Sequence, residues 1–158
     1  MRHLVWQGIH APMMEIAHVE SWQRARGTQL GVAYELRWEF ESERLLVELV
    51  GGSTHEFELA DADFFDLLDS AFFNSLPVVR DGLLQGGGAR DYVMRYVSHP
   101  PLAAASVRQR YEPVGNRTVR FTSGEFERDI EFDDDGFVNL YAATHSQGIW
   151  QMKLGGAK

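Results

Sequence analysis

Two short segments of this 158-residue chain bring polar side chains with binding chemistry into apolar surroundings. In the segment from Arg108 to Tyr111, the two arginines share one parity, while Gln109 and Tyr111 share the other. Side chains of one parity lie on one face of a strand, so an inward-facing Gln109 and Tyr111 would bring hydrogen-bonding groups into an apolar interior. Ligand pockets combine apolar walls with a few convergent polar groups. The alternative is a buried tyrosine paired with a backbone group, with both arginines in solvent.

The second segment runs from Phe72 to Arg80 and holds two aromatic residues, an asparagine, a proline and an arginine. It is either a buried crossing loop or the rim of a cavity. In either position Asn74 needs a partner for its amide if it is buried, because buried polar groups are almost always hydrogen-bonded.

Groups suited to proton transfer are present but scattered. Asp66 and Asp69 are three residues apart and would share a helix face, and His99 stands directly before two prolines, where a strand must end. The six histidines show none of the close pairings of a zinc site, and the acidic run from Asp133 to Asp135 fits a charged hairpin turn better than a calcium loop. We therefore assign no catalytic residue and no metal ligand.

Composition excludes several classes of function. The chain has no cysteine, so thiolate nucleophiles, disulfides and cysteine-ligated metal sites are absent. Serine-hydrolase, nucleotide-binding and dinucleotide-binding motifs are also absent, and the sequence predicts no cofactor. A formal net charge of -8 disfavours nucleic acid, whose phosphates require clustered basic residues.

The elements that must position these groups are strands. Alternating apolar and polar residues predict strands over 30–40, 92–97 and 107–112, and weaker alternation predicts strands over 4–9 and 15–24. Hairpins are expected where 44–50 and 54–59 flank two glycines, and where 125–133 and 137–141 flank an acidic turn with glycine. An aromatic content of 12% favours sheets as well. The fold class is therefore mainly β, with antiparallel pairing.

One helix and one domain complete the expected organisation. Apolar residues at helical spacing predict a short helix over 61–71, which ends before Leu76 because a residue that precedes proline avoids the helical region. The length suits a single β domain over 1–158, with a frayed C-terminus at about 152–158. No stretch has the length of a membrane helix or an export signal, so we expect a soluble, cytoplasmic protein. The sequence does not predict the oligomeric state.

The whole pattern resembles the bacterial family named "Putative glycolipid-binding", formerly a domain of unknown function. The resemblance lies in Trp6-x-Gly8, Phe73-Asn74-Ser75-Leu76-Pro77-Val78-Val79-Arg80, Ser106-Val107-Arg108-Gln109-Arg110-Tyr111, Ser123-Gly124-Glu125-Phe126 and Asp133-Asp134-Asp135-Gly136-Phe137-Val138-x-x-Tyr141. This sequence departs from the family pattern at Ser75, at Asp81 and after Tyr141. The resemblance implies a single antiparallel sheet curled into an open half-barrel that holds a ligand against its concave face.

The leading functional interpretation is non-catalytic binding of an amphipathic, glycolipid-like small molecule. The candidate ligand-binding residues are Phe73, Asn74, Arg80, Tyr96, Gln109, Arg110 and Tyr111. One alternative is a small-molecule enzyme that uses Asp66, Asp69, His99 or Tyr111 for proton transfer, which requires at least two of them in one cleft. Another is an interaction module that pairs its exposed strand edges with a partner protein.

Overall fold

The computed structural model describes residues 1–9, 12–31, 33–141 and 150–154, and for 150–154 it describes the backbone only. Thirteen strands, one α-helix and one short 3₁₀ helix are present in these ranges. The first strands are β1 (Arg2–Gly8), β2 (Met14–Ser21), β3 (Arg24–Leu30), β4 (Glu35–Glu41), β5 (Arg44–Leu49), β6 (Thr54–Glu58) and β7 (Phe64–Leu67). The remaining elements are α1 (Ala71–Asp81), η1 (Leu83–Gln85), β8 (Arg90–Ser98), β9 (Ala103–Gly115), β10 (Thr118–Ser123), β11 (Phe126–Phe132), β12 (Val138–Tyr141) and β13 (Trp150–Leu154).

The strands divide into two parts. The first part, β6-β5-β4-β3-β2-β1, is antiparallel throughout, and β13 joins β1 to the second part, β12-β11-β10-β9-β8-β7. The second part is mixed because β7 pairs with β8 in parallel. The mainly β prediction is confirmed, but the prediction of a single antiparallel sheet is wrong. β7 and β8 can pair in parallel because they are linked by a crossover that contains α1, and parallel neighbours require such a connection.

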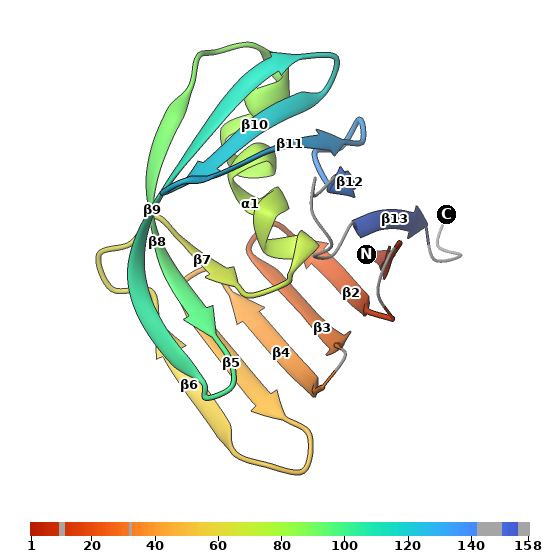
Figure 1. Cartoon of the computed structure of the whole chain (residues 1–158), viewed down its shortest axis with the longest axis vertical. Helices are drawn as coiled ribbons and strands as arrows, with labels where there is room; N and C mark the ends of the chain where they lie inside the picture. The colour runs from red at the N-terminus through yellow and green to blue at the C-terminus, as the bar shows by residue number, and fades with distance from the viewer. Residues whose placement is uncertain (10–11, 32, 142–149, 155–158) are drawn as a thin grey trace.

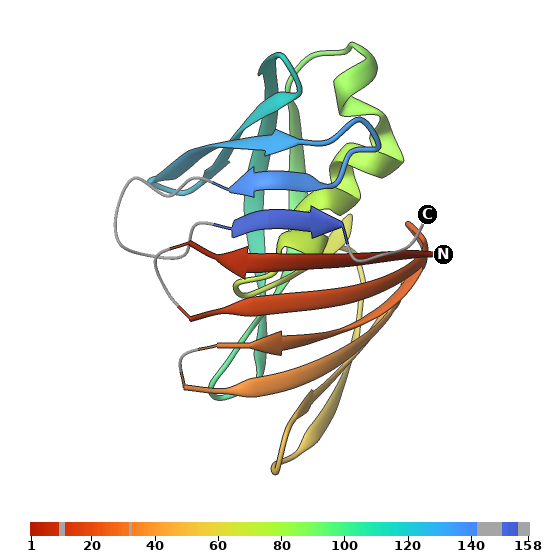
Figure 2. The same cartoon turned by 90° about the vertical axis from the view of Figure 1, so that its right-hand side faces the viewer.

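The second part curls into a half-barrel, as expected, and α1 lies against its concave side (Figure 1). In the view turned by 90°, β1 to β4 and β11 to β13 lie one above another as a single stack, and α1 stands behind the β12 end of it (Figure 2). Eight consecutive residues of α1, from Ala71 to Val78, are buried. The helix therefore fills the concave face with its own side chains.

The strands follow the expected alternation wherever one face meets this core. In β4, Leu36, Trp38 and Phe40 are buried, while Arg37 and the three glutamates that alternate with them are exposed. Trp38 stacks on Phe72 of α1 with ring centroids 4.9 Å apart, and Phe73 meets Phe40 edge-on at 5.5 Å. The core between the first part of the sheet and α1 is thus an aromatic wall, here defined as Trp38, Phe40, Phe72 and Phe73.

The predicted helix over 61–71 is wrong in its position. Residues 64–67 form β7, whose four side chains are all buried, and a strand buried on both faces reads as a continuous apolar run that periodicity cannot distinguish from a buried helix. The helix begins at Ala71, ten residues after the predicted start, where the Ser70 side chain accepts a hydrogen bond from the backbone N–H of Phe73. It contains Pro77 and ends at Gly82, whose φ of 58° suits glycine.

The expected acidic hairpin turn is present between β11 and β12. Asp133 Oδ1 accepts hydrogen bonds from the backbone N–H groups of Asp135 and Phe137, at 3.0 and 2.9 Å. Arg2 of β1 pairs with Asp135 at 2.7 Å. These carboxylates therefore stabilise a turn and its contact with β1.

The expectations for the C-terminus fall largely outside the described residues. The structure gives the backbone of β13 as far as Leu154, and residues 155–158 lie beyond the described ranges. The single-domain boundary 1–158 stays a prediction.

Candidate functional site

The two segments singled out by the sequence meet in the interior of the second part of the sheet. Gln109 and Tyr111 of β9 both face inward and are buried, with 4% and 0% of their surfaces exposed. Asn74 of α1 is also buried, and its Nδ2 donates a hydrogen bond to the Tyr111 hydroxyl at 3.3 Å. Gln109 and Tyr111 therefore face inward, and both arginines, Arg108 and Arg110, are exposed, as the alternative interpretation expects. The partner of Tyr111 is a side-chain amide and not a backbone group, and Asn74 has the partner that its burial requires.

Asp66 of β7 supplies a carboxyl group to the same interior. It is 6% exposed, and Gln109 Nε2 donates a hydrogen bond to its Oδ2 at 2.7 Å. Burial raises the pKa of Asp66 to about 7, although the hydrogen bonds from Gln109 and from the backbone of Leu67 oppose that rise. Desolvation disfavours the charged form of an acid, so near neutral pH this carboxyl group is populated both with and without its proton.

Gln109 leaves its amide oxygen without a hydrogen bond in the described part of the chain. Its Nε2 is paired with Asp66, but its buried Oε1 has no hydrogen-bond partner within residues 1–9, 12–31, 33–141 and 150–154. A buried acceptor without a donor carries a free-energy cost. A ligand hydroxyl or amide placed beside Oε1 would remove it.

Tyr96 and Tyr141 border this group of polar side chains. Burial, followed by the charges of Asp66 and Asp69, raises the pKa of Tyr96. Burial and the charge of Asp66 raise the pKa of Tyr141 in the same direction. Both phenols therefore keep their protons and can donate a hydrogen bond. We define the interior polar cluster as Asp66, Asn74, Tyr96, Gln109 and Tyr111.

A second polar group lies nearer to solvent, at the end of β8. We call it the marginal group, and it consists of Tyr34, Asp69 and His99. The Tyr34 hydroxyl donates to the exposed Asp69 at 3.1 Å, and the Tyr34 ring meets the His99 ring edge-on with centroids 4.3 Å apart. His99 is 6% exposed, and burial lowers its pKa, so the imidazole is largely neutral near pH 7. The charges of Asp66 and Asp69 both contribute to the raised pKa of Tyr96, but no side-chain hydrogen bond within the described residues joins Tyr34 or His99 to the interior polar cluster.

A second buried carboxyl group, that of Glu15 in β2, was not identified from the sequence. It is fully buried and accepts hydrogen bonds from Gln29 Nε2 at 3.0 Å, from the Ser70 hydroxyl at 2.7 Å and from the Phe72 backbone at 3.0 Å. Burial raises its pKa, while these hydrogen bonds oppose the rise. The available signal was parity, because Glu15 shares the inward face of β2 with Ala17 and Val19.

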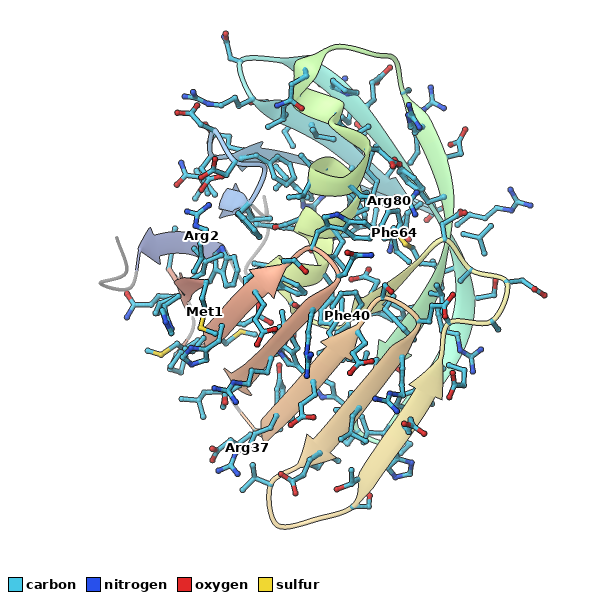
Figure 3. All side chains as sticks on the ribbon, turned by 180° about the vertical axis from the view of Figure 1, so that it is seen from behind. Met1, Arg2, Arg37, Phe40, Phe64 and Arg80 are labelled. Carbon is cyan, nitrogen blue, oxygen red and sulfur yellow. The ribbon has the colours of Figure 1, made fainter. Side chains whose placement is uncertain are left out.

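The other predicted site residues lie apart from the interior polar cluster. Arg80 is exposed at the end of α1, where it pairs with Asp81 at 2.8 Å and covers the Phe64 ring at 4.0 Å (Figure 3). Arg110 is exposed on the outer face of β9 and pairs with Asp91 at 3.2 Å. Phe73 belongs to the aromatic wall. Only Asn74, Tyr96, Gln109 and Tyr111 come together with Asp66.

The residues proposed for proton transfer separate into two groups. Asp66 and Tyr111 belong to the interior polar cluster, and the charge of Asp66 contributes to the raised pKa of Tyr111. Asp69 and His99 both contact Tyr34 at the margin. Two candidates lie near each other in each group, but the enzyme interpretation requires a cleft, and the pocket lined by Arg95 and Ser106 includes none of these four residues. The small-molecule enzyme therefore stays an alternative.

No helix of the described ranges is both long and apolar enough to cross a membrane.

The chain is similar to a known protein family and to a solved structure. The family model described as "Putative glycolipid-binding" matches residues 17–147. A crystal structure of a DUF1089 family protein from Pseudomonas aeruginosa aligns with a TM-score of 0.68 at 19% sequence identity, covering 89% of this chain and 94% of the other. At that identity the likeness concerns the fold. None of the curated proteins matches the sequence.

Proposed function

The chain belongs to the "Putative glycolipid-binding" family, and from this premise we propose that it binds an amphipathic, glycolipid-like molecule without catalysing a reaction. The observation that carries the proposal is the gathering of Asp66, Gln109 and Tyr111 in the interior, where Gln109 Nε2 pairs with Asp66 while Gln109 Oε1 lacks a donor within the described residues. Sugar hydroxyls both donate and accept hydrogen bonds. They would complement a carboxyl group near its pKa, an amide oxygen and a protonated phenol.

We place the polar part of the ligand at the margin, between Tyr34 and Tyr96, so that it reaches the interior polar cluster. The support is the hydrogen bond between Tyr34 and the exposed Asp69, together with the influence of both aspartates on the pKa of Tyr96. Asn74 and Tyr111 then act as positioning residues, since they already satisfy each other.

The apolar part of the ligand would lie along the partly buried hydrophobic side chains that border the core. Tyr34, Leu102 and Ala104 pack against the core without being fully covered. Because α1 already fills the concave face, a long acyl chain would have to extend along this border instead of lying under the helix. Each buried methylene contributes roughly 0.8 kcal/mol, which corresponds to up to about a fourfold gain in affinity per methylene.

The test is recovery of a bound molecule from a total lipid extract by native mass spectrometry, followed by titration with alkyl glucosides of increasing chain length. We expect affinity to increase with chain length, and we expect Gln109→Leu to weaken binding at least tenfold. The matched control is Arg110→Leu on the outer face of β9, which should bind within twofold of the unaltered protein. Equal binding by the two variants, or no dependence on chain length, would contradict the proposal.

The two alternatives produce different results in the same experiments. Turnover by Asp66, Asp69, His99 or Tyr111 would return the ligand with a changed mass. Pairing of a partner protein with a sheet edge is disfavoured at β6, because this outer strand carries Glu56 and Glu58, and charged edge strands resist pairing.

A further inference from the structure

A separate pocket lies between the connection from β6 to β7 and the adjoining part of β8 and β9. Its volume is about 220 Å³, and Leu59, Ala60, Ala62 and Val93 form apolar walls. Its polar groups come from Asp61, Arg95 and Ser106. Arg95 and Ser106 are direct cross-strand neighbours, so their side chains lie on the same face of the sheet.

This pocket is distinct from the interior polar cluster. Along β8, Arg95 alternates with Tyr96, so the two side chains lie on opposite faces of the strand. The connection that covers the pocket is tied to β8 at Val93, whose backbone pairs in both directions with Asp63, at 2.7 and 2.8 Å. The pocket therefore has one wall of sheet and one wall of fixed loop.

Arg95 belongs to a minority of arginines in the described ranges that form no ion pair, together with Arg26, Arg108 and Arg128, and among these four it is the one that lines the pocket. Most of the arginines pair with a carboxylate, as Arg80 pairs with Asp81 and Arg110 with Asp91. Arg95 has no ion pair within the described residues, and its Nε is buried without a hydrogen-bond acceptor there. Asp61 also lines the pocket but is exposed and stands outside ion-pair distance of Arg95. In a chain of net charge -8, an unpaired guanidinium in a pocket requires an explanation.

We propose that the pocket is a binding site for a small oxyanion, a carboxylate or a phosphate monoester, that carries a short apolar substituent. The guanidinium presents a planar fork of N–H donors that matches two oxygens of such a group. The Ser106 hydroxyl adds a further donor beside it, and the apolar walls lower the local dielectric and strengthen the attraction. The walls of Leu59, Ala62 and Val93 receive the substituent.

The test follows the Arg95 side-chain N–H and Ser106 amide signals by NMR in ¹⁵N-labelled protein. The probes are inorganic phosphate and monohexyl phosphate, at ionic strength held constant with sodium chloride. We expect saturable shifts of both signals, with monohexyl phosphate binding at least threefold more tightly than inorganic phosphate. Equal affinities would overturn the role of the apolar walls, and shifts that never saturate would overturn the site.

Variants separate a site from a general attraction of charges. Arg95→Gln should weaken binding of monohexyl phosphate at least tenfold, and Arg95→Lys should weaken it less, because the charge remains while the fork is lost. The control is Arg26→Gln, which removes an exposed arginine from β3 in the first part of the sheet and should leave binding within twofold. An equal loss in Arg26→Gln would show that net charge alone attracts the anion. Unchanged thermal unfolding of each variant excludes misfolding as the cause.

Discussion

Glu15 and Asp66 are both buried carboxyl groups, and their surroundings differ in one decisive respect. Glu15 receives three hydrogen bonds, from Gln29, Ser70 and the backbone of Phe72. Asp66 receives one side-chain hydrogen bond, from Gln109, and one from the backbone of Leu67. The amide oxygens of Gln29 and Gln109 are both unpaired within the described residues, so the difference lies in the number of donors to each carboxyl group. Burial raises the pKa of both groups.

The difference separates a structural group from a candidate binding group. Glu15 reaches across from the first part of the sheet to the beginning of α1, where helix N–H groups lack partners and a negative charge is favourable. It therefore fixes the position of α1. Asp66 is held by fewer donors than Glu15, so its carboxyl oxygens keep hydrogen-bonding capacity that a ligand hydroxyl could use. The predictions that follow test whether the two groups can be distinguished in this way.

The largest effect is expected from Glu15→Ala. The substitution leaves the donors of Gln29, Ser70 and Phe72 buried without an acceptor, so we expect the free energy of unfolding to fall by about 3–5 kcal/mol. Urea unfolding followed by circular dichroism measures it. Glu15→Gln keeps one acceptor oxygen and should cost less than half as much. Equal stability of Glu15→Ala and the unaltered protein would show that Glu15 does not hold α1.

Gly27→Ala is expected to have the next largest effect. Gly27 of β3 lies under Trp38, so an added Cβ would stand 2.3 Å from Trp38 Cζ2 and 2.7 Å from the backbone oxygen of Ile16. Overpacking of this kind typically costs about 1–3 kcal/mol, measurable by urea unfolding together with tryptophan fluorescence. Gly88→Ala, at a position with open space, is the control and should change stability by less than about 0.5 kcal/mol. A stable Gly27→Ala variant would contradict the close packing of the aromatic wall.

The pH dependence of stability is expected to report on Asp66. From about pH 4 to about pH 7, the folded state retains a proton that the unfolded state has lost, because burial raises the pKa of Asp66 from 3.8 to about 7. The free energy of unfolding should therefore decrease with rising pH, by roughly 1.4 kcal/mol per pH unit from this group, and level off above pH 7. Urea unfolding at a series of pH values measures the slope.

Asp66→Asn should remove that part of the slope. The remaining decrease should come from Glu15, whose pKa is shifted in the same direction. The introduced asparagine side chain can still pair with Gln109 because the glutamine amide can turn its unused oxygen toward a donor. An unchanged slope in Asp66→Asn would mean that Asp66 is not the buried titrating group.

The smallest effect is expected from Arg110→Ala. Arg110 and its partner Asp91 are both exposed, and surface ion pairs contribute about 0–1 kcal/mol. We expect a change in the free energy of unfolding below about 0.5 kcal/mol, and a smaller one at high salt. A loss above about 1.5 kcal/mol would assign Arg110 a structural role that its position on the outer face of β9 does not suggest.

Local pattern was sufficient for most strands but not for the helix. Trp38 and Phe40 alternate with charged residues, and the burial of β4 follows directly. The helix depends on Glu15, which is far from Phe72 in sequence and supplies an acceptor at its beginning. The sequence pattern of residues 61–81 carries no information about that contact with Glu15. The continuous buried run of β7 also cannot be distinguished from a buried helix by its periodicity.

The candidate site was predictable to the extent that it follows from strand parity. Parity placed Gln109 and Tyr111 on one face of β9, and burial shows that this face is the interior. It could not reveal that Arg80 would pair with its neighbour Asp81, or that Asp66 would belong to a strand beside β8 and not to a helix with Asp69. Those facts depend on the β7-α1-β8 crossover, which sequence spacing alone did not indicate.

The pairing of β13 with both β1 and β12 has a consequence for the order of folding. In the first part of the sheet, each strand pairs with its neighbour in sequence from β1 to β6, so these hairpins involve short loop closures and can form as soon as the chain leaves the ribosome. The strand that joins the two parts pairs Leu154 with Leu4. The edge of β1 therefore stays unpaired during synthesis until β13 emerges, so the two parts of the sheet can join only after nearly all of the other strands have been made.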